Sequence, residues 1–382
     1  MPRQPMTFEE TDDVRSVRSR IRELIRDELP SDFRGAFVPG SAGQEAATAF
    51  CKVLATEHLL TLAWPRKHGG GDGSVWEQTA LREEYWAHHE PRGAQYMGVN
   101  WVGPAIMHFG TERQQEQHLS AIAAGDAVWC QGFSEPDAGS DLAALQLSAD
   151  TEDGQTFVAN GQKVWTSYAG LANWCFLTAR TARTDDKRHG ITVFLVPMDR
   201  PGITVRPIDS ILGPHHLNEL FFDDVVLDES EILGELHRGW DVVRLVLRFE
   251  RQGIARYARS DRILADLYSQ VASADGPDGD FLRAEHARAL VGARIARLMS
   301  YRVVASGDVL PSISRIAVTE LDQRVAELAM AVHGPDGLDT HERLPGGESP
   351  EEAWRYARSS TIASGTTEIQ RMLAARQMVK EA

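Results

Sequence analysis

The chain has 382 residues, of which 42% are hydrophobic, and this length predicts two or three packed units rather than one small core. Its 40 Lys and Arg residues and 55 Asp and Glu residues give a formal net charge of -15 without a long run of one sign, which argues against a nucleic-acid or anionic-membrane partner. Three widely spaced cysteines, a polar N-terminus and the lack of a long apolar run lead us to expect a cytoplasmic protein with no membrane span.

The first part of the chain has the apolar spacing of helices. Apolar residues at 14, 17, 21, 24 and 25 predict an amphipathic helix from Val14, and further helices are expected at Glu45–Leu60 and Trp76–His88. The glycine-rich stretch Trp64–Ser74 predicts a loop, because no strand precedes it as a phosphate-binding loop would require. Residues 1–125 are therefore expected to form an N-terminal helical domain.

The middle of the chain changes to short β-rich runs separated by Gly and Asp turns, a pattern typical of an antiparallel domain rather than of alternating βαβ units. These runs begin near residues 156, 174, 191, 203 and 219. We expect residues 126–235 to form a β-barrel or β-sandwich domain. Long helices return from Arg238, with loops predicted at Asp275–Asp280 and Pro345–Pro350, and indicate a four-helix bundle within residues 236–382. The expected fold class is α+β.

Two motifs in the middle region carry the functional signal. Gln131–Asp141 reads QGFSEPDAGSD, and Asn160–Ser167 reads NGQKVWTS. Together, in this order and at this interval, they resemble the flavin-binding signature of the acyl-CoA dehydrogenase family, and the resemblance extends over nearly the whole chain. It implies the three-domain fold expected above, with FAD bound between the middle and C-terminal domains.

A bound isoalloxazine ring needs an apolar face and fixed polar atoms around its edge. Trp165 offers such a face, and the resemblance implies that Ser134 and Ser167 bind the pyrimidine side and the N5 side of the ring. Gly139 allows a close approach of the main chain, and Ser140 matches a position near the pyrophosphate and the thioester. Each residue alone is also explained by a core or turn position. The predicted cofactor-binding residues are Gln131, Phe133, Ser134, Gly139, Ser140, Trp165, Ser167, Thr366 and Glu368.

A third motif, Thr361–Arg371, reads TIASGTTEIQR and resembles the C-terminal catalytic motif of the family. Many members have a glutamate where this chain has Ser364, and a serine without a partner cannot act as the α-proton base. Some branches carry the base on an early helix of the C-terminal domain, and that position is Glu250 here. We therefore predict Glu250 as the catalytic residue, the alternative being a solvated or arginine-paired helical glutamate. Ser140 and Ser364 are the predicted substrate-binding residues, Ser364 through its backbone N–H.

The chemistry implied by these residues is the α,β-desaturation of an acyl thioester. It requires a carboxylate beside the α-carbon, flavin N5 beside the β-carbon and hydrogen-bond donors on the thioester carbonyl. The carrier is expected to be coenzyme A or acyl carrier protein, and the family's usual electron acceptor is an electron-transfer flavoprotein. Two alternatives stay open, an oxygen-using oxidase or monooxygenase of the same fold and a non-catalytic partner subunit of a heteromeric dehydrogenase.

Two segments depart from the family pattern at the expected subunit interface, and one histidine pair is a candidate for a metal site. Ser260–Ala265 and Ala331–Gly337 stand where the family often has segments that reach the flavin of a neighbouring subunit. We therefore expect a homo- or hetero-oligomer, a dimer or tetramer, with a heteromer as a real alternative. His215 and His216 are adjacent in a turn, and because neighbouring side chains of extended chain point apart, no metal site is predicted.

Overall fold

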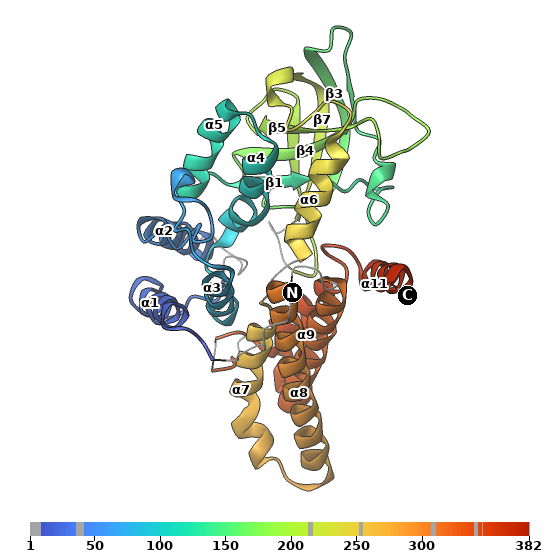
Figure 1. Cartoon of the computed structure of the whole chain (residues 1–382). Coiled ribbons are helices and arrows are strands. Elements are labelled where there is room, and N and C mark those ends of the chain that lie inside the picture. The colour runs from blue at the N-terminus through green and yellow to red at the C-terminus, as the bar shows by residue number, and fades with distance from the viewer. Residues whose placement is uncertain are drawn as a thin grey trace.

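A computed structural model of the chain confirms the α+β class and the expected order of helices, sheet and helices (Figure 1). The structure describes residues 9–35, 42–212, 217–251, 255–306, 311–339, 343–345 and 347–381, without the side chains of residues 250, 251, 306, 380 and 381. The sheet lies at one end of the molecule, the C-terminal bundle extends from the other end, and α1, α2 and α3 lie to one side (Figure 1).

The N-terminal helices begin where side chains cap their first turns. Ser74 and Thr111 form reciprocal capping boxes with Glu77 and Gln114, and Thr11 accepts a hydrogen bond from the Val14 N–H. The three helices expected from the sequence are present. The elements before the sheet are α1 (Asp12–Glu28), α2 (Ala42–Thr56), η1 (Arg66–His68), α3 (Val75–Ala87), η2 (Gly93–Gln95), η3 (Gly98–Val102), α4 (Gly103–Phe109) and α5 (Glu112–Ala123).

The middle region forms one sheet of seven strands, in the order β1-β4-β2-β3-β7-β6, with β5 paired to β4. Most pairings are antiparallel, as expected, but β1 and β2 each pair with β4 in parallel. The runs expected near 156, 174, 191, 203 and 219 are β3 to β7, whereas the short strands β1 and β2 were not predicted. The strands are β1 (Trp129–Gly132), β2 (Ser148–Asp150), β3 (Thr156–Ser167), β4 (Trp174–Arg180), β5 (Ile191–Pro197), β6 (Ile203–Ile208) and β7 (Leu217–Asp228).

Helix α6 (Gly239–Arg251) is the first helix after the sheet and packs against it. Val242 and Val246 of this helix share one hydrophobic core with Val193 of β5, Ile106 of α4 and the N-terminal helices. A separate core, which includes Phe157, lies within the sheet region. Figure 1 shows α6 running from the sheet toward the bundle, so it connects the two.

The remaining helices form the expected C-terminal bundle around α9, and α11 packs against α9 at its edge. Helix α8 begins at Gly276, inside the loop predicted at Asp275–Asp280. The prediction of a loop over the whole of this stretch is therefore wrong. The reason is local, since Gly276 takes a φ of 70° and Pro277 follows at a first-turn position that a helix tolerates. The helices are α7 (Tyr257–Ser273), α8 (Gly276–Ser306), α9 (Pro311–His333), α10 (Pro350–Ser360) and α11 (Thr367–Glu381), with η6 (Gly334–Leu338) between α9 and α10.

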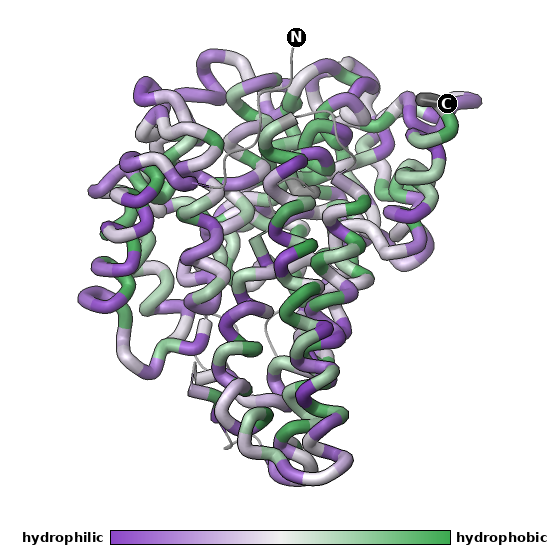
Figure 2. The backbone as a smooth tube through the Cα atoms, turned by 60° about the horizontal axis from the view of Figure 1, so that its bottom comes forward, coloured by the Kyte–Doolittle hydropathy of each residue, from purple (hydrophilic) through white to green (hydrophobic). Residues whose placement is uncertain are grey.

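Hydrophilic and hydrophobic residues alternate along the helices (Figure 2). Of the helices that the structure describes, none combines the length and the apolar character needed to cross a membrane.

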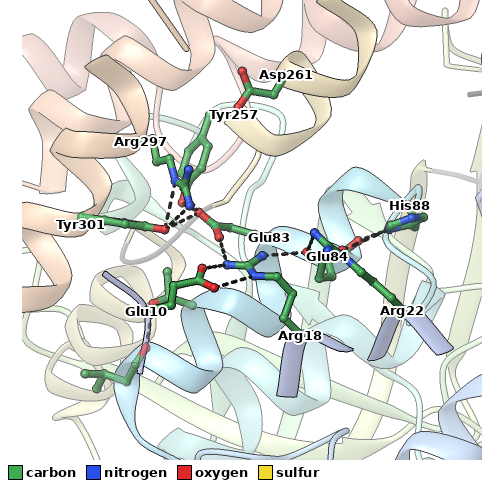
Figure 3. A network of polar contacts seen from close by, with 12 residues as sticks. Glu10, Arg18, Arg22, Glu83, Glu84, His88, Tyr257, Asp261, Arg297 and Tyr301 are labelled. Atoms are coloured by element: carbon green, nitrogen blue, oxygen red, sulfur yellow. Dashed lines mark hydrogen bonds and ion pairs between the residues drawn. The ribbon is translucent and has the colours of Figure 1, made fainter. Parts of the chain in front are cut away.

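A polar network joins the N-terminal helices to the bundle, with the buried Glu83 of α3 at its centre (Figure 3). Glu83 Oε1 accepts hydrogen bonds from the hydroxyls of Tyr257 at 2.7 Å and Tyr301 at 2.9 Å and from Arg297 Nε at 3.1 Å. Its other oxygen accepts from Arg18 Nη2 of α1 at 2.7 Å. Because a buried carboxylate needs this many donors, the network fixes α1 and α3 against α7 and α8.

A second buried carboxylate makes the stability of the bundle depend on pH. Glu348 pairs with Arg259 and, at 2.5 Å, with Arg262. Burial by itself raises the pKa of Glu348, but the two arginines outweigh burial and lower its pKa from 4.5 to about 2. A lowered folded-state pKa gives stability that is present above the unfolded pKa and is lost as the pH falls through the folded pKa.

We therefore expect the free energy of unfolding to fall between pH 4.5 and about 2 by on the order of 3 kcal/mol from this group. Urea unfolding across this range measures it. Glu348→Gln should be less stable at neutral pH and should lose less stability on acidification. An unchanged pH profile in this variant would show that Glu348 does not contribute.

Candidate active site

The two predicted flavin motifs are joined by a buried ion pair. Lys163 Nζ lies 2.8 Å from Glu135 Oε1 and also donates to the carbonyl of Phe133 at 3.2 Å. The Glu135 carboxylate accepts the backbone N–H groups of Gln146 at 2.6 Å and Leu147 at 2.9 Å. Burial opposes the charge on Lys163 and lowers its pKa, while Glu135 acts in the opposite direction. The pair therefore holds the first motif against β3.

A bulge in β3 turns Trp165 out of the sheet. Lys163 pairs with Leu220 and Thr166 with Asn218, so β3 carries an extra residue between these pairs. Trp165 takes a φ of 58°, a conformation that is unfavourable for a tryptophan, and its side chain is 58% exposed. The buried Asn218 stabilises the bulge by donating to the Thr166 carbonyl at 3.1 Å. The strain thus presents a large aromatic face at the surface of the sheet domain.

Two of the polar residues predicted around the flavin, Ser134 and Ser167, lie near this ring. Ser134 accepts the Val164 N–H at 2.8 Å through its carbonyl, which places it beside the bulge, and Ser134 and Ser167 are both half-buried. The Gln131 Nε2 atom is buried and has no hydrogen-bond acceptor in the described part of the chain. An aromatic face, two hydroxyls and an unsatisfied amide fit the needs of an isoalloxazine ring.

The other residues of the first motif have different surroundings. Phe133 is buried and packs on Phe176, with ring centroids 5.8 Å apart, so it supports the site from inside. Gly139 and Ser140 are exposed, and a side-chain carbon added to Gly139 would meet nothing within 4 Å. Close packing around Gly139 is therefore absent, although a ligand has room to approach it.

A pocket of about 1180 Å³ brings Ser140 together with α6 and α11. Trp240 and Leu247 of α6 and Ile369 and Leu373 of α11 supply its apolar wall. Three elements far apart in the sequence therefore meet at the edge of the predicted flavin site.

Glu250, the predicted base, belongs to α6 one turn beyond Leu247, and its side chain lies outside the described residues. His215 and His216 also lie outside them, and the described part of the chain contains no cluster of three potential metal ligands.

The turn before α11 exposes backbone donors. Ser364 and Gly365 have φ values of 59° and 90°, and no described residue accepts a hydrogen bond from the N–H groups of Ser364, Gly365 or Thr366. Arg315 Nη2 fixes the turn by donating to the Ala363 carbonyl at 2.6 Å. Successive N–H groups in such a conformation, next to a helix N-terminus, attract an oxygen atom that carries negative charge.

The last two predicted cofactor-binding residues belong to the start of α11. Thr366 caps this helix, its hydroxyl accepting the Ile369 N–H at 3.3 Å, and Glu368 is exposed in the first turn. The structure thus gives Thr366 a role in the fold, and any contact of either residue with the cofactor stays a prediction.

Sequence reasoning missed Lys163 and Glu135, although both lie within the motifs. Both are ordinary charged residues in sequence, and only the fold shows that Lys163 is completely buried. It also missed the pocket, because α6, α11 and the turn at Ser140 are distant in the chain.

Replacing Trp165 with alanine is expected to weaken flavin binding by more than about tenfold, because the ring face is lost. The melting temperature should change little, since the ring is 58% exposed in the structure. Flavin content after purification and a binding titration measure the effect, with Trp165→Phe as the control that keeps an aromatic face. If Trp165→Ala binds flavin as tightly as the unchanged protein, the ring is not part of the site.

Comparison with known proteins covers all three regions. The acyl-CoA dehydrogenase N-terminal, middle and C-terminal domain models match residues 11–126, 130–225 and 237–379. The acyl-CoA dehydrogenase IpdE1 of Mycobacterium tuberculosis is 35% identical over 384 residues, which covers 96% of this chain and 97% of the relative. IpdE1 of Mycolicibacterium smegmatis is 33% identical over 392 residues, which covers 96% and 97% of the two chains.

Solved structures agree with this family. A chain of the steroid acyl-CoA dehydrogenase Tcur3481-Tcur3483 has a TM-score of 0.87 at 26% identity, with 98% of this chain and 99% of that chain covered. A chain of the ChsE4-ChsE5 complex from Mycobacterium tuberculosis gives the same TM-score, identity and coverage. Members of the family are FAD-dependent oxidoreductases that act on acyl-CoA. The chain belongs to the acyl-CoA dehydrogenase family.

Proposed function

We propose that this protein desaturates an acyl-CoA thioester between its α- and β-carbons, with FAD as the cofactor. The observation that carries the proposal is the Trp165 ring, which a bulge presents beside the half-buried Ser134 and Ser167. FAD, when bound, accepts the hydrogen and the electron pair that leave the β-carbon. The names of the relatives support the same reaction.

Within this proposal Glu250 removes the α-proton. It belongs to α6, the helix that lines the pocket next to Ser140, and a carboxylate at this position supplies the base that Ser364 cannot be. The unsatisfied N–H groups of Ser364 and Gly365 donate to the thioester carbonyl and stabilise its developing charge. Ser364 thus serves through its backbone.

The carrier is proposed to be coenzyme A, because the pocket has an excess of cationic side chains. Its charged lining residues are Asp141, Asp186, Lys187, Arg188, Arg238, Asp241, Arg244 and Arg376. Three are acidic and five are basic. In the described part of the chain, neither Arg188 nor Arg376 forms an ion pair, so both are free to bind phosphate groups.

We infer that the protein works as an oligomer with a second, related chain. Ser260 and Leu264, in the segment that reaches a neighbouring flavin in relatives, are fully buried within their own bundle, so these two side chains do not reach a neighbouring subunit. Val291, Ile295 and Leu298 form an exposed apolar stripe on α8, which a partner subunit would cover. The titles of two similar structures name two-component assemblies, which supports a heteromer.

An electron-transfer flavoprotein is the proposed electron acceptor, by analogy with the family. A cytoplasmic location is proposed because Cys51, Cys130 and Cys175 are all free thiols.

Product analysis tests the proposed reaction. The protein, with a partner chain if one is needed for flavin loading, is incubated with a panel of saturated acyl-CoA thioesters and an artificial electron acceptor. The expected product is an enoyl-CoA that has lost two hydrogens. Oxygen-dependent turnover without a thioester would instead favour an oxidase or monooxygenase, and a complex that keeps full activity when Glu250 is replaced would favour a non-catalytic subunit.

A further inference from the structure

Arg82 has no carboxylate partner among the residues that the structure describes. It extends from α3, where its Nη2 atom donates to Asn100 Oδ1 at 3.1 Å. Arg92 Nη1 donates to the same oxygen at 3.3 Å, and Arg92 itself forms an ion pair with Glu90 at 2.6 Å. No carboxylate among the described residues forms an ion pair with Arg82. The buried Arg92 and the half-buried Arg82 therefore share one anion and one amide oxygen.

The surroundings of Arg82 make this imbalance costly. Burial, followed by the charge of Arg92, lowers the pKa of Arg82 to about 10. Its side chain nevertheless keeps accessible surface, because the residue is half-buried. A largely desolvated guanidinium that keeps free donors and some accessible surface is suited to binding an oxygen atom of a ligand.

Arg256 is a second under-satisfied guanidinium near this site. Its Cζ atom lies 5.0 Å from the ring centroids of both Trp86 and Tyr356, and Nη2 donates to the Tyr356 hydroxyl at 2.9 Å. Its Nε and Nη1 atoms are buried without a hydrogen-bond acceptor in the described part of the chain. The carboxylate that it faces, Asp322, is 3.7 Å away and binds Arg259 at 2.6 Å.

Aromatic residues connect the two arginines with the flavin site. Trp86 contacts Tyr96 edge to face at 6.5 Å, and Arg92 lies 4.9 Å from the centre of the Tyr96 ring. Tyr168 directly follows Ser167, and burial, followed by the nearby Tyr356, raises its pKa well above the ordinary value. Arg256 also lies only a few residues after Glu250 in the sequence. Tyr356, which accepts a hydrogen bond from Arg256, therefore links this arginine to the residue after Ser167. Tyr96 interacts with both Arg82 and Arg256.

We propose that the acyl group of the substrate carries an oxygen acceptor, a carboxylate or a ketone, at the end remote from the thioester, and that Arg82 and Arg256 bind this oxygen. Arg82 makes the first contact because part of its surface is accessible. A plain alkyl group would leave the guanidinium donors buried against hydrocarbon, which is costly. The inference rests on the proposed function and adds to it the class of substrate.

Matched substrates test the inference. The flavin-loaded protein is given saturated acyl-CoA thioesters of equal chain length that end in a methyl group, a methyl ketone or a carboxylate, over a range of lengths. At the best length, kcat/KM for an oxygenated thioester should exceed that for the plain one by about 10- to 100-fold. The ketone and carboxylate arms identify which oxygen is preferred. Equal kcat/KM for all three end groups overturns the inference.

Variants assign the preference to the arginines. Arg82→Met should remove most of it by lowering kcat/KM for the oxygenated thioester, with little change for the plain one. Arg26→Met, which removes an exposed arginine of α1, should keep the preference. Arg82→Lys and Arg256→Lys keep a positive charge and replace Arg82→Met in the test if that variant does not fold. Each should reduce the preference for the oxygenated thioester. If Arg82→Met, Arg82→Lys and Arg256→Lys all keep the full preference for the oxygenated thioester, the proposed roles of the two arginines are contradicted.

Turnover tests the proposed reaction, and binding of the thioesters tests the recognition of the acyl end group separately. If none of the thioesters is desaturated, the proposed reaction is wrong. Binding is then measured as the rise in melting temperature that each thioester causes. The oxygenated thioesters should stabilise the protein more than the plain one, and this difference should disappear in Arg82→Met. Equal stabilisation by all of them overturns the inference by itself.

Discussion

Glu250→Gln is expected to lower the rate of desaturation by about 100- to 10,000-fold, the usual contribution of a positioned general base, while flavin remains bound. Glutamine has almost the same size as glutamate but cannot accept the α-proton. The residue lies in α6 rather than in the sheet motifs that present Trp165, so the yellow colour should persist. The rate at which an acyl-CoA reduces the flavin in a single turnover, monitored by flavin absorbance under anaerobic conditions, measures the effect on the desaturation step alone.

The matched control is Ser364→Gly. Ser364 has a φ of 59°, which glycine adopts readily, so this change removes the hydroxyl and keeps the backbone N–H and the turn. The rate should stay close to that of the unchanged protein. If Glu250→Gln keeps the full rate, Glu250 is not the base. If Ser364→Gly loses as much rate as is expected of Glu250→Gln, the Ser364 side chain takes part in the reaction and the assignment of the base is wrong.

Lys163→Met is expected to destabilise the protein by about 3–5 kcal/mol, because it leaves the Glu135 carboxylate buried without its cation. Flavin should be lost as well, since the same ion pair holds the first motif against β3. Urea unfolding and flavin content after purification measure the two effects.

An exposed pair in the same region provides the comparison. Lys187 and Asp141 also form an ion pair, but both side chains are more than half exposed. Lys187→Met should therefore change stability by less than about 1 kcal/mol. The double replacement Lys163→Met with Glu135→Leu should recover part of the lost stability, because no charge is then left unpaired. Equal losses in Lys163→Met and Lys187→Met would show that burial does not decide the strength of these pairs.

The sequence predicted the helices and most strands because their apolar spacing is local. Val14, Ile21 and Leu24 recur on one face of α1 and are buried, as expected. The start of α8 was missed because Gly276 and Pro277 are typical of loops and also occur at helix starts. Strands β1 and β2 were missed because each has four residues or fewer, too short for an alternating pattern.

The site was predictable only where it is continuous in sequence. Trp165, Ser134 and Ser167 come from two motifs that β3 and its neighbours align, so a motif resemblance was sufficient to find them. Arg82 and Arg256 are far apart in the chain, and both interact with Tyr96 only because α3 packs against α7. A single sequence contains no signal for such a tertiary contact.

An anaerobic titration with acyl-CoA tests whether this protein desaturates an acyl-CoA thioester. The purified flavin-loaded protein, with its partner chain where one is needed, is mixed anaerobically with increasing amounts of a saturated acyl-CoA while the flavin absorbance band is recorded. We expect the band to be bleached in proportion to the thioester added and an enoyl-CoA to be formed in equal amount. A band that every saturated acyl-CoA leaves unchanged would contradict the assignment of this chain as an acyl-CoA desaturating enzyme.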